Sequence, residues 1–194
     1  MFTAIKLILF PFRTWEKISL ARRGAASILC LFLLPWTVVA VSVEAYSLVH
    51  WGERHSGVEF MIKVGADTAI RYALSQAILL IGCVVVGAKA VQAVAHSFQV
   101  PSDYSQCLNL MGYGSSPILL ARLLDAVPVV NTWACWVLGA LISSSVLYQG
   151  VALVLRPEQT KGFGIYMVSV LLLVLSSLLS HFIAMTVLHG KSVF

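Results

Sequence analysis

The sequence predicts an all-α protein, a polytopic transmembrane helical bundle of about five spans with a short interfacial N-terminal helix. Of its 194 residues, 59% are hydrophobic and only 11% are charged, and the mean hydropathy is +0.91. Soluble domains carry roughly 25% charged residues, because a domain of this size leaves much of its surface in water. The apolar residues also lie in runs of about 20 or more, the length that crosses a bilayer. We therefore expect a bilayer to be the natural solvent of this chain.

The first part of the chain, residues 1–24, is basic and predicts a cytoplasmic, amphipathic interfacial segment. Five cations lie here against one acidic residue (Lys6, Arg13, Glu16, Lys17, Arg22 and Arg23). A basic segment that precedes the first span is expected to stay in the cytoplasm. Nucleic-acid binding is the other common interpretation of a net charge of +5, but it needs a soluble basic face. We expect no nucleic-acid partner.

Within this segment a short helix is expected from Pro11, because proline fits the first turn of a helix. Phe12, Trp15 and Ile18 recur at helical spacing. We expect Trp15 at the depth of the lipid headgroups and the cations toward anionic lipid. The alternative is a plain juxtamembrane tail.

The remainder, residues 25–194, is expected to form one transmembrane domain. Its first span covers about residues 25–49, where Pro35 is expected to kink the helix. Glu44 lies near the far end of this span. We expect it to pair with a cation of another span or to reach the aqueous edge. A loop of mixed charge follows over residues 50–67.

The second and third apolar segments differ in length and composition. The second covers about residues 69–95, and Lys89 near its end can extend to the interface. The third covers about residues 108–127 and is short. It contains two glycines and a proline as well as charged residues near its far end (Gly112, Gly114, Pro117, Arg122 and Asp125). Whether this segment crosses the whole bilayer is left open.

Two further spans complete the expected bundle, at about residues 129–155 and 163–188. The short loop between them carries Arg156 and Lys161. With five spans and the N-terminus in the cytoplasm, the C-terminus lies outside. The same topology places the loop with Arg156 and Lys161 in the cytoplasm, in agreement with the positive-inside bias.

The run YSQCLNLMGYGSSPILLARLLDAVP, residues 104–128, resembles the signature of the Yip family of Rab-interacting membrane proteins. In that family a Gly-Tyr pair precedes a proline, and an apolar stretch leads to a second proline. The corresponding positions here are Gly112, Tyr113, Pro117 and Pro128. The opening PFRTWEKI and the run LYQGVALVLRPEQTKG are also similar to the family. The resemblance covers essentially the whole chain.

The resemblance implies a five-span membrane protein without enzymatic activity. Eukaryotic members carry a long cytoplasmic N-terminal region with an Asp-Leu-Tyr-Gly-Pro motif, which this chain lacks. It is similar instead to the compact prokaryotic members, and we expect it in a bacterial cytoplasmic membrane. Expected partners are the lipid bilayer, other membrane proteins or a second copy of the chain.

The charged residues inside apolar segments are the candidate functional groups, because charges are costly in a bilayer. Arg122 and Asp125 are spaced i, i+3 and are able to pair on one helix face. They either form a polar pocket beside Tyr113 or an ion path, or they are an ion pair that fixes the short helix. Glu44 has Arg122 or Lys89 as its candidate partner.

A polar face in the last span has two interpretations as well. Ser176, Ser177, Ser180 and His181 lie close together there. A transporter could use such a face for protons or substrate, but serine side chains also hold membrane helices together by hydrogen bonds.

No catalytic, metal or cofactor site is predicted. His50, Glu53, His55 and Glu59 cluster in the first loop, but their spacing matches no known metal site. The chain has no phosphate-binding glycine loop and no HExxH motif. Its four cysteines have no metal-type spacing and are expected to be buried free thiols.

The leading hypothesis is therefore a non-enzymatic membrane scaffold or adaptor of the Yip type, or a membrane-organising protein. The alternative is a small transporter or channel with a polar path lined by charged residues of several spans (Glu44, Lys89, Arg122, Asp125 and His181).

Overall fold

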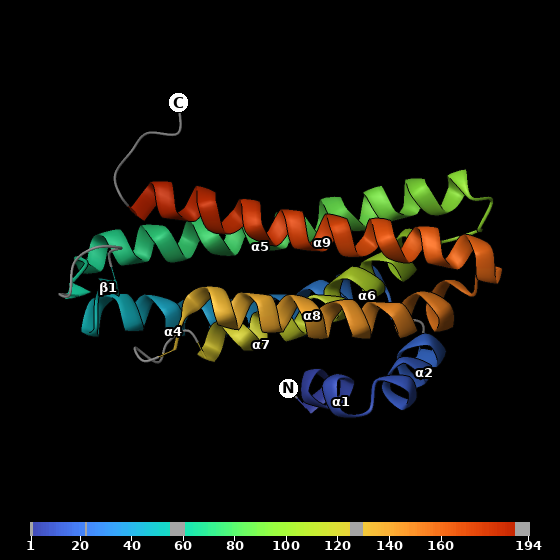
Figure 1. Ribbon diagram of the computed structural model, residues 1–194, viewed down its shortest axis with the longest axis horizontal. Coiled ribbons are helices and arrows are strands. Elements are labelled where there is room, and N and C mark those ends of the chain that lie inside the picture. The colour runs from blue at the N-terminus through green and yellow to red at the C-terminus, as the bar shows by residue number, and fades with distance from the viewer. Residues whose placement is uncertain (1, 22, 55–60, 125–129, 189–194) are drawn as a thin grey trace.

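The computed structural model describes residues 2–21, 23–54, 61–124 and 130–188. Two short helices, α1 (Phe2–Leu9) and α2 (Pro11–Ala21), precede the bundle. The chain then passes along the long axis of the bundle five times, reversing direction after each pass (Figure 1). The predicted all-α bundle is confirmed. The strands β1 (Glu53–Arg54) and β2 (Met61–Ile62) are two residues each and pair in the first loop.

The first pass contains a wide helical turn beside its proline. It consists of α3 (Ala25–Ile28), the π-helical turn η1 (Leu29–Leu33) and α4 (Leu34–His50). Pro35 has no N–H to donate, and its ring clashes with the carbonyl of the preceding turn. A π-helical turn just before the proline accommodates this clash without ending the helix. The structure places this turn where a kink was expected.

The other passes are long helices, except for the third. The second is α5 (Ala66–Ser97), the fourth is α8 (Thr132–Gly150) continued by the π-helical turn η2 (Val151–Leu155), and the fifth is α9 (Gln159–Leu188). Helices α5 and α9 lie side by side over most of their length (Figure 1).

The third pass is divided into α6 (Tyr104–Gly114) and α7 (Ser116–Leu124), which follow each other in one direction (Figure 1). Within the described residues, four helices have the length and composition to cross a membrane, at Ala25–His50, Ala66–Ser97, Thr132–Leu155 and Thr160–Thr186. The divided third pass is not among them, so the number of five spans stays a prediction.

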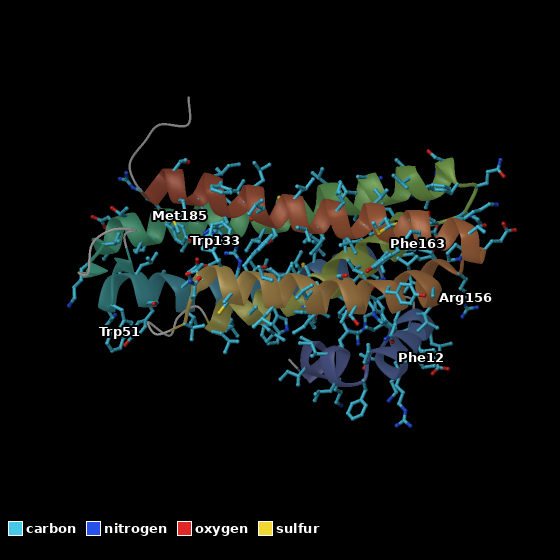
Figure 2. The ribbon with its side chains drawn as sticks, viewed as in Figure 1. Phe12, Trp51, Trp133, Arg156, Phe163 and Met185 are labelled. Carbon is cyan, nitrogen blue, oxygen red and sulfur yellow. The ribbon has the colours of Figure 1, made fainter. Side chains whose placement is uncertain are left out.

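Aromatic side chains gather toward both ends of the bundle and mark its two interfaces. Trp51 and Trp133 lie toward one end, and Phe163 lies toward the other end, near Arg156 (Figure 2). All three aromatic side chains are exposed on the surface of the bundle. Aromatic residues are enriched where a membrane protein meets the headgroups. This arrangement agrees with four long apolar helices that are embedded in a bilayer.

The N-terminal helices pack on the outside of the bundle, against α7, α8 and η2 (Figure 1). The helix from Pro11 is confirmed, whereas α1 was not expected. The side chain of Trp15 does not face lipid headgroups: it is 0% exposed and lies inside the protein, and its depth in the bilayer stays a prediction. Phe12, which was grouped with it, is 60% exposed and faces outward. A buried tryptophan needs an acceptor for its N–H, and the bundle supplies one.

Candidate functional site

Helix α6 is the most enclosed helix of the bundle, and residues 107–114 are all buried. Small residues allow this close packing. A Cβ added at Gly112 would lie 3.3 Å from Cγ2 of Ile28, and one at Gly114 would lie 2.5 Å from Cδ2 of Leu147. Glycine lets membrane helices approach each other closely. The two glycines of the family motif therefore fix the position of α6 against α3 and α8.

Tyr113, between these glycines, lies at the centre of an aromatic cluster. Its ring meets Phe32 at 4.2 Å between centroids and Trp15 edge-on at 6.3 Å and 83°. Its hydroxyl accepts a hydrogen bond from Nη1 of Arg23 at 3.0 Å. We call these four residues, Trp15, Arg23, Phe32 and Tyr113, the Tyr113 junction. It joins the N-terminal helices, the first pass and α6.

The Tyr113 junction also reaches α8 through the indole of Trp15. Its Nε1 donates to the carbonyl of Val146 at 2.9 Å. Gly150 leaves room for the ring, since a Cβ there would lie 2.7 Å from Cζ2 of Trp15. The N-terminal helices are thus attached to the bundle by the hydrogen bond of Trp15 and by the close packing of its ring beside Gly150 and on Tyr113 of the family motif.

The break between α6 and α7 follows from Pro117. Proline has no N–H, so the carbonyl of Tyr113, four residues earlier, has no helical donor. The hydroxyl of Ser116 donates to this carbonyl at 2.7 Å, and the hydroxyl of Ser115 donates to Gly112 at 2.8 Å. The bend therefore leaves neither of these two carbonyl groups unpaired. Beyond it, Gly139 of α8 faces the backbone of Pro117.

A buried polar cluster lies near the other end of α7. Nη1 of Arg122 is 3.4 Å from Oε2 of Glu44, and these residues are 7% and 8% exposed. The hydroxyl of Tyr72 donates to Oε1 of the same carboxylate at 2.5 Å. The predicted pairing of Glu44 with Arg122 is confirmed. The cluster links α4, α5 and α7 by charge-assisted hydrogen bonds, which are stronger than neutral ones.

Gln76 and Ser180 extend the cluster to α9. Gln76 is fully buried. The donors and acceptors around it assign the positions of its amide oxygen and nitrogen. Its oxygen accepts from both Nη atoms of Arg122, and its nitrogen donates to the carbonyl of Ser180 at 3.2 Å. We call Glu44, Tyr72, Gln76, Arg122 and Ser180 the Arg122 cluster.

A small cavity of about 20 Å³ borders the Arg122 cluster, large enough for about one water molecule. It is lined by Arg122, Trp136 and His181, among others. Nε of Arg122 has no hydrogen-bond partner in the described part of the chain. Nε1 of Trp136 donates to the hydroxyl of Ser177 at 3.2 Å. The hydroxyl of Ser177 therefore makes an interhelical contact, whereas the hydroxyls of Ser176 and Ser180 donate to carbonyl groups of α9 itself.

Of the predicted polar path, Glu44, Arg122 and His181 lie together, whereas Lys89 lies apart from them. Lys89 is exposed and lies 4.4 Å from the ring centroid of Tyr104, in contact with Gln92 rather than with Glu44. His181 lies beside the Arg122 cluster. Asp125 and Pro128 lie outside the described residues, so the proposed pairing of Asp125 with Arg122 stays a prediction. Gly112, Tyr113, Pro117 and Arg122 all lie in the buried third pass.

The sequence did not single out four residues that complete these sites: Arg23 as the partner of Tyr113, and Phe32, Tyr72 and Gln76. Tyr72 and Gln76 are spaced i, i+4 on α5, which places both on one helix face. This spacing of polar residues in an apolar helix is a signal that could have found them.

Neither cysteine nor metal chemistry emerges from the described residues. Among them, no three His, Cys, Asp or Glu side chains gather as metal ligands; His55 and Glu59 of the first loop lie outside these residues. Cys30, Cys83 and Cys107 are free thiols. Cys107 and Cys135 are buried as expected, whereas Cys30 is exposed on the outside of the first pass, contrary to the expectation.

The fold and the two sites define an integral, multi-pass membrane protein whose helices meet through small residues and buried polar groups. Residues 5–181 match the family described as the Yip1 domain. The chain therefore belongs to the Yip1 domain family, and the resemblance to the Yip family is confirmed. Comparison with curated proteins and with solved structures gives no match.

Proposed function

We propose that this protein is a non-enzymatic membrane-organising protein of the Yip type, which acts as a scaffold or adaptor. The observation that supports this most is the apolar outer face of its N-terminal helices. Their inner face is buried against the bundle, yet large apolar side chains are exposed on the outside (Ile5, Leu9, Phe10, Phe12 and Leu20).

Such a face belongs in lipid. A helix that is apolar outside and carries cations lies in the membrane interface, and Lys6, Arg13 and Lys17 are all exposed. The N-terminal helices would therefore widen the protein in one leaflet only. A protein with unequal cross-sections in the two leaflets favours curved membrane.

The Tyr113 junction gives the N-terminal helices a fixed position. A loosely attached amphipathic helix would follow the membrane independently of the bundle. Trp15, which is hydrogen-bonded to α8 and packed on Tyr113, couples them instead. This supports a structural role for the family motif.

Curvature preference is tested with tubules pulled from giant vesicles that contain the labelled protein. We expect wild-type protein to be enriched in tubules over the flat membrane, and the double variant Phe10→Ser, Phe12→Ser to lose most of this enrichment. The matched control is Leu171→Ser, Leu175→Ser, which removes equally exposed apolar side chains from α9. An even distribution of the wild type would contradict the proposal.

The adaptor role is tested by crosslinking in native membranes. We expect crosslinked species that contain a second copy of the chain or another membrane protein. Recovery of the monomer alone would count against a scaffold or adaptor.

The proposed location is the cytoplasmic membrane of a bacterium, with the N-terminus in the cytoplasm. The excess of cations in residues 1–24 supports this orientation. Accessibility of a tag at each end to a membrane-impermeant reagent tests it: the N-terminal tag should be protected in intact cells and the C-terminal tag labelled.

A small transporter is the second candidate, and the Arg122 cluster is the observation in its favour. Buried charges within a membrane helix often mark an ion or proton pathway. Flux into liposomes tests this candidate: Arg122→Lys keeps the charge but loses the planar fork. Flux by the wild type that this variant reduces would support transport, and absence of flux would remove the candidate.

A further inference from the structure

A polar cleft lies where α2, α6 and η2 meet, at the opposite end of α6 from the break at Pro117. Its volume is about 240 Å³, and it is lined by Ile18, Ser19, Arg23, Asp103, Ser105, Gln106, Asn109 and Val154. Pockets for drug-sized molecules have about 300–1,000 Å³. The cleft is thus suited to a small polar group rather than to a whole lipid.

The cleft lies at the membrane boundary. Arg23 is two residues before the span Ala25–His50, and Val154 is the penultimate residue of the span Thr132–Leu155. Leu20, next to Ser19 on α2, is exposed. Lipid is therefore adjacent to the cleft, with a polar lining on one side and an apolar helix face on the other.

Asn109 provides the cleft with an acceptor that lacks a donor. Its Nδ2 donates to the carbonyl groups of Arg23 and Ser105, at 3.2 and 2.9 Å, which fixes the orientation of the amide. The residue is 5% exposed, and its Oδ1 has no hydrogen-bond partner among the described residues. An unpaired buried acceptor costs free energy. Because Asn109 lines the cleft, a small movement of its amide would bring Oδ1 to an N–H donor of a ligand bound there.

The charges in the cleft have both signs. The guanidinium of Arg23 uses Nη1 for Tyr113, and its other N–H groups are suited to bind phosphate oxygens. Asp103 is exposed at the start of α6 and places a carboxylate among the same lining residues. A purely anionic ligand would be repelled by Asp103, whereas a zwitterion satisfies both residues.

We propose that this cleft binds the headgroup of a phospholipid that carries a phosphate and a primary ammonium, namely phosphatidylethanolamine. The phosphate lies against Arg23, and the ammonium lies between Asp103 and Oδ1 of Asn109. Ile18 and Val154 border the glycerol end. A trimethylammonium group has no N–H to donate, so phosphatidylcholine binds more weakly. This site depends only on the position of the chain in a membrane and not on the proposed curvature preference.

Native mass spectrometry of the full chain, released from micelles that contain one test lipid at a time, measures this selectivity. A series of four lipids consists of phosphatidylethanolamine, its N-methyl and N,N-dimethyl derivatives and phosphatidylcholine, and phosphatidylserine and phosphatidylglycerol are tested beside it. We expect one phosphatidylethanolamine per chain, bound about tenfold more tightly than phosphatidylcholine, with a stepwise decline along the series as N–H donors are lost. Equal binding of the four lipids would overturn the proposal, as would tighter binding of phosphatidylserine or phosphatidylglycerol.

Two variants remove the charges separately, and each has a matched control. Asp103→Asn should reduce the tenfold preference to about twofold or less; Asn is an equally good residue at the start of a helix, so α6 is preserved. Arg23→Gln should instead weaken the binding of phosphatidylethanolamine and phosphatidylcholine alike, because both lipids carry the phosphate that Arg23 binds. Lys161→Gln at the same end and Asp67→Asn at the start of α5 carry the same charge changes outside the cleft and should keep the affinity and the preference. Equal losses in variants and controls would overturn the assignment of the cleft.

A competition experiment identifies the source of the headgroup. Water-soluble glycerophosphoethanolamine is added to the chain bound to phosphatidylethanolamine. We expect displacement only at concentrations far above that of the lipid, because the soluble ester lacks the acyl chains that adjoin Leu20. Displacement at equal concentration would show that a free phosphate ester, and not a membrane lipid, is the ligand.

Discussion

Helices α6 and α7 follow one another directly in the chain, yet they meet their neighbours through different chemistry. Helix α6 approaches α3 and α8 through Gly112 and Gly114, and the ring of Tyr113 packs on Phe32. Helix α7 instead carries Arg122, which reaches a carboxylate on α4 and an amide on α5. One half is fixed mainly by shape and the other by charge.

The difference reflects the limited choice of forces in lipid. Apolar side chains gain little by leaving lipid for another helix, so close packing and hydrogen bonds select the partner. A substitution in a close-packed contact lowers stability only moderately, because a neighbouring side chain is able to move. Loss of one partner of a buried ion pair lowers stability strongly, because the remaining charge is left uncompensated. The two halves should therefore respond very differently to single substitutions.

The largest effect is expected from Arg122→Leu. Removing one partner of a buried ion pair leaves the other charge uncompensated and costs about 3–5 kcal/mol. We expect a loss of this size in the free energy of unfolding, measured in mixed micelles by denaturant titration. The double variant Glu44→Leu, Arg122→Leu should recover most of the loss, since replacing both partners with apolar groups is often nearly neutral.

Lys161→Gln is the control for charge removal alone. Lys161 pairs with Glu158 at 3.0 Å, but both side chains are substantially exposed, and exposed pairs contribute at most about 1 kcal/mol. If Arg122→Leu destabilised the protein no more than Lys161→Gln does, charge would not be what fixes α7.

An intermediate effect is expected from Gly150→Ala, which tests the shape of the α6 side. The added methyl group would overlap the ring of Trp15 and the side chain of Leu110, and such overpacking costs about 1–3 kcal/mol. We expect a loss of this size in the free energy of unfolding, together with faster protease cleavage at Arg13 and Lys17 as α2 loosens.

Gly82→Ala is its control, because a Cβ at Gly82 of α5 meets nothing within 4 Å. We expect it to be neutral or slightly stabilising, since alanine favours a helix more than glycine does. Similar losses in the two variants would mean that glycine matters for the helix backbone and not for the contact with Trp15.

The sequence predicted the parts of this structure that depend on composition and spacing along one segment. Long apolar runs identified the long helices, and the Gly-Tyr motif identified the family. Charge cost in lipid singled out Arg122 and Glu44 as residues that need partners, and their pairing was one of several alternatives that the sequence left open. Each of these signals is local, or it follows from the rule that a buried charge needs an opposite charge.

What the sequence could not supply was the direction of side chains between segments. Trp15 was expected in the headgroups because tryptophan is common there, but the choice between lipid and protein depends on how α2 docks on α8. Arg23 is one of five cations in residues 1–24, and only the fold shows which of them reaches Tyr113. Asn109 is one polar residue in a buried helix, and its unpaired oxygen is visible only in three dimensions.

The smallest effect is expected from Tyr113→Phe, which keeps the ring and removes only the hydroxyl that accepts from Arg23. A hydrogen bond from a charged donor at a partly exposed site contributes about 1 kcal/mol. We expect a loss of this size, and a double-mutant cycle with Arg23→Gln should assign most of it to this pair.

Tyr104→Phe on the same helix is the matched control, because its hydroxyl donates to Val85 at 3.4 Å, beyond the optimal range. It should cost less than Tyr113→Phe and show no coupling to Arg23→Gln. If the Tyr113 cycle showed no coupling either, the ring alone would hold the N-terminal helices. The α6 half would then depend on shape throughout, and the contrast with α7 would be complete.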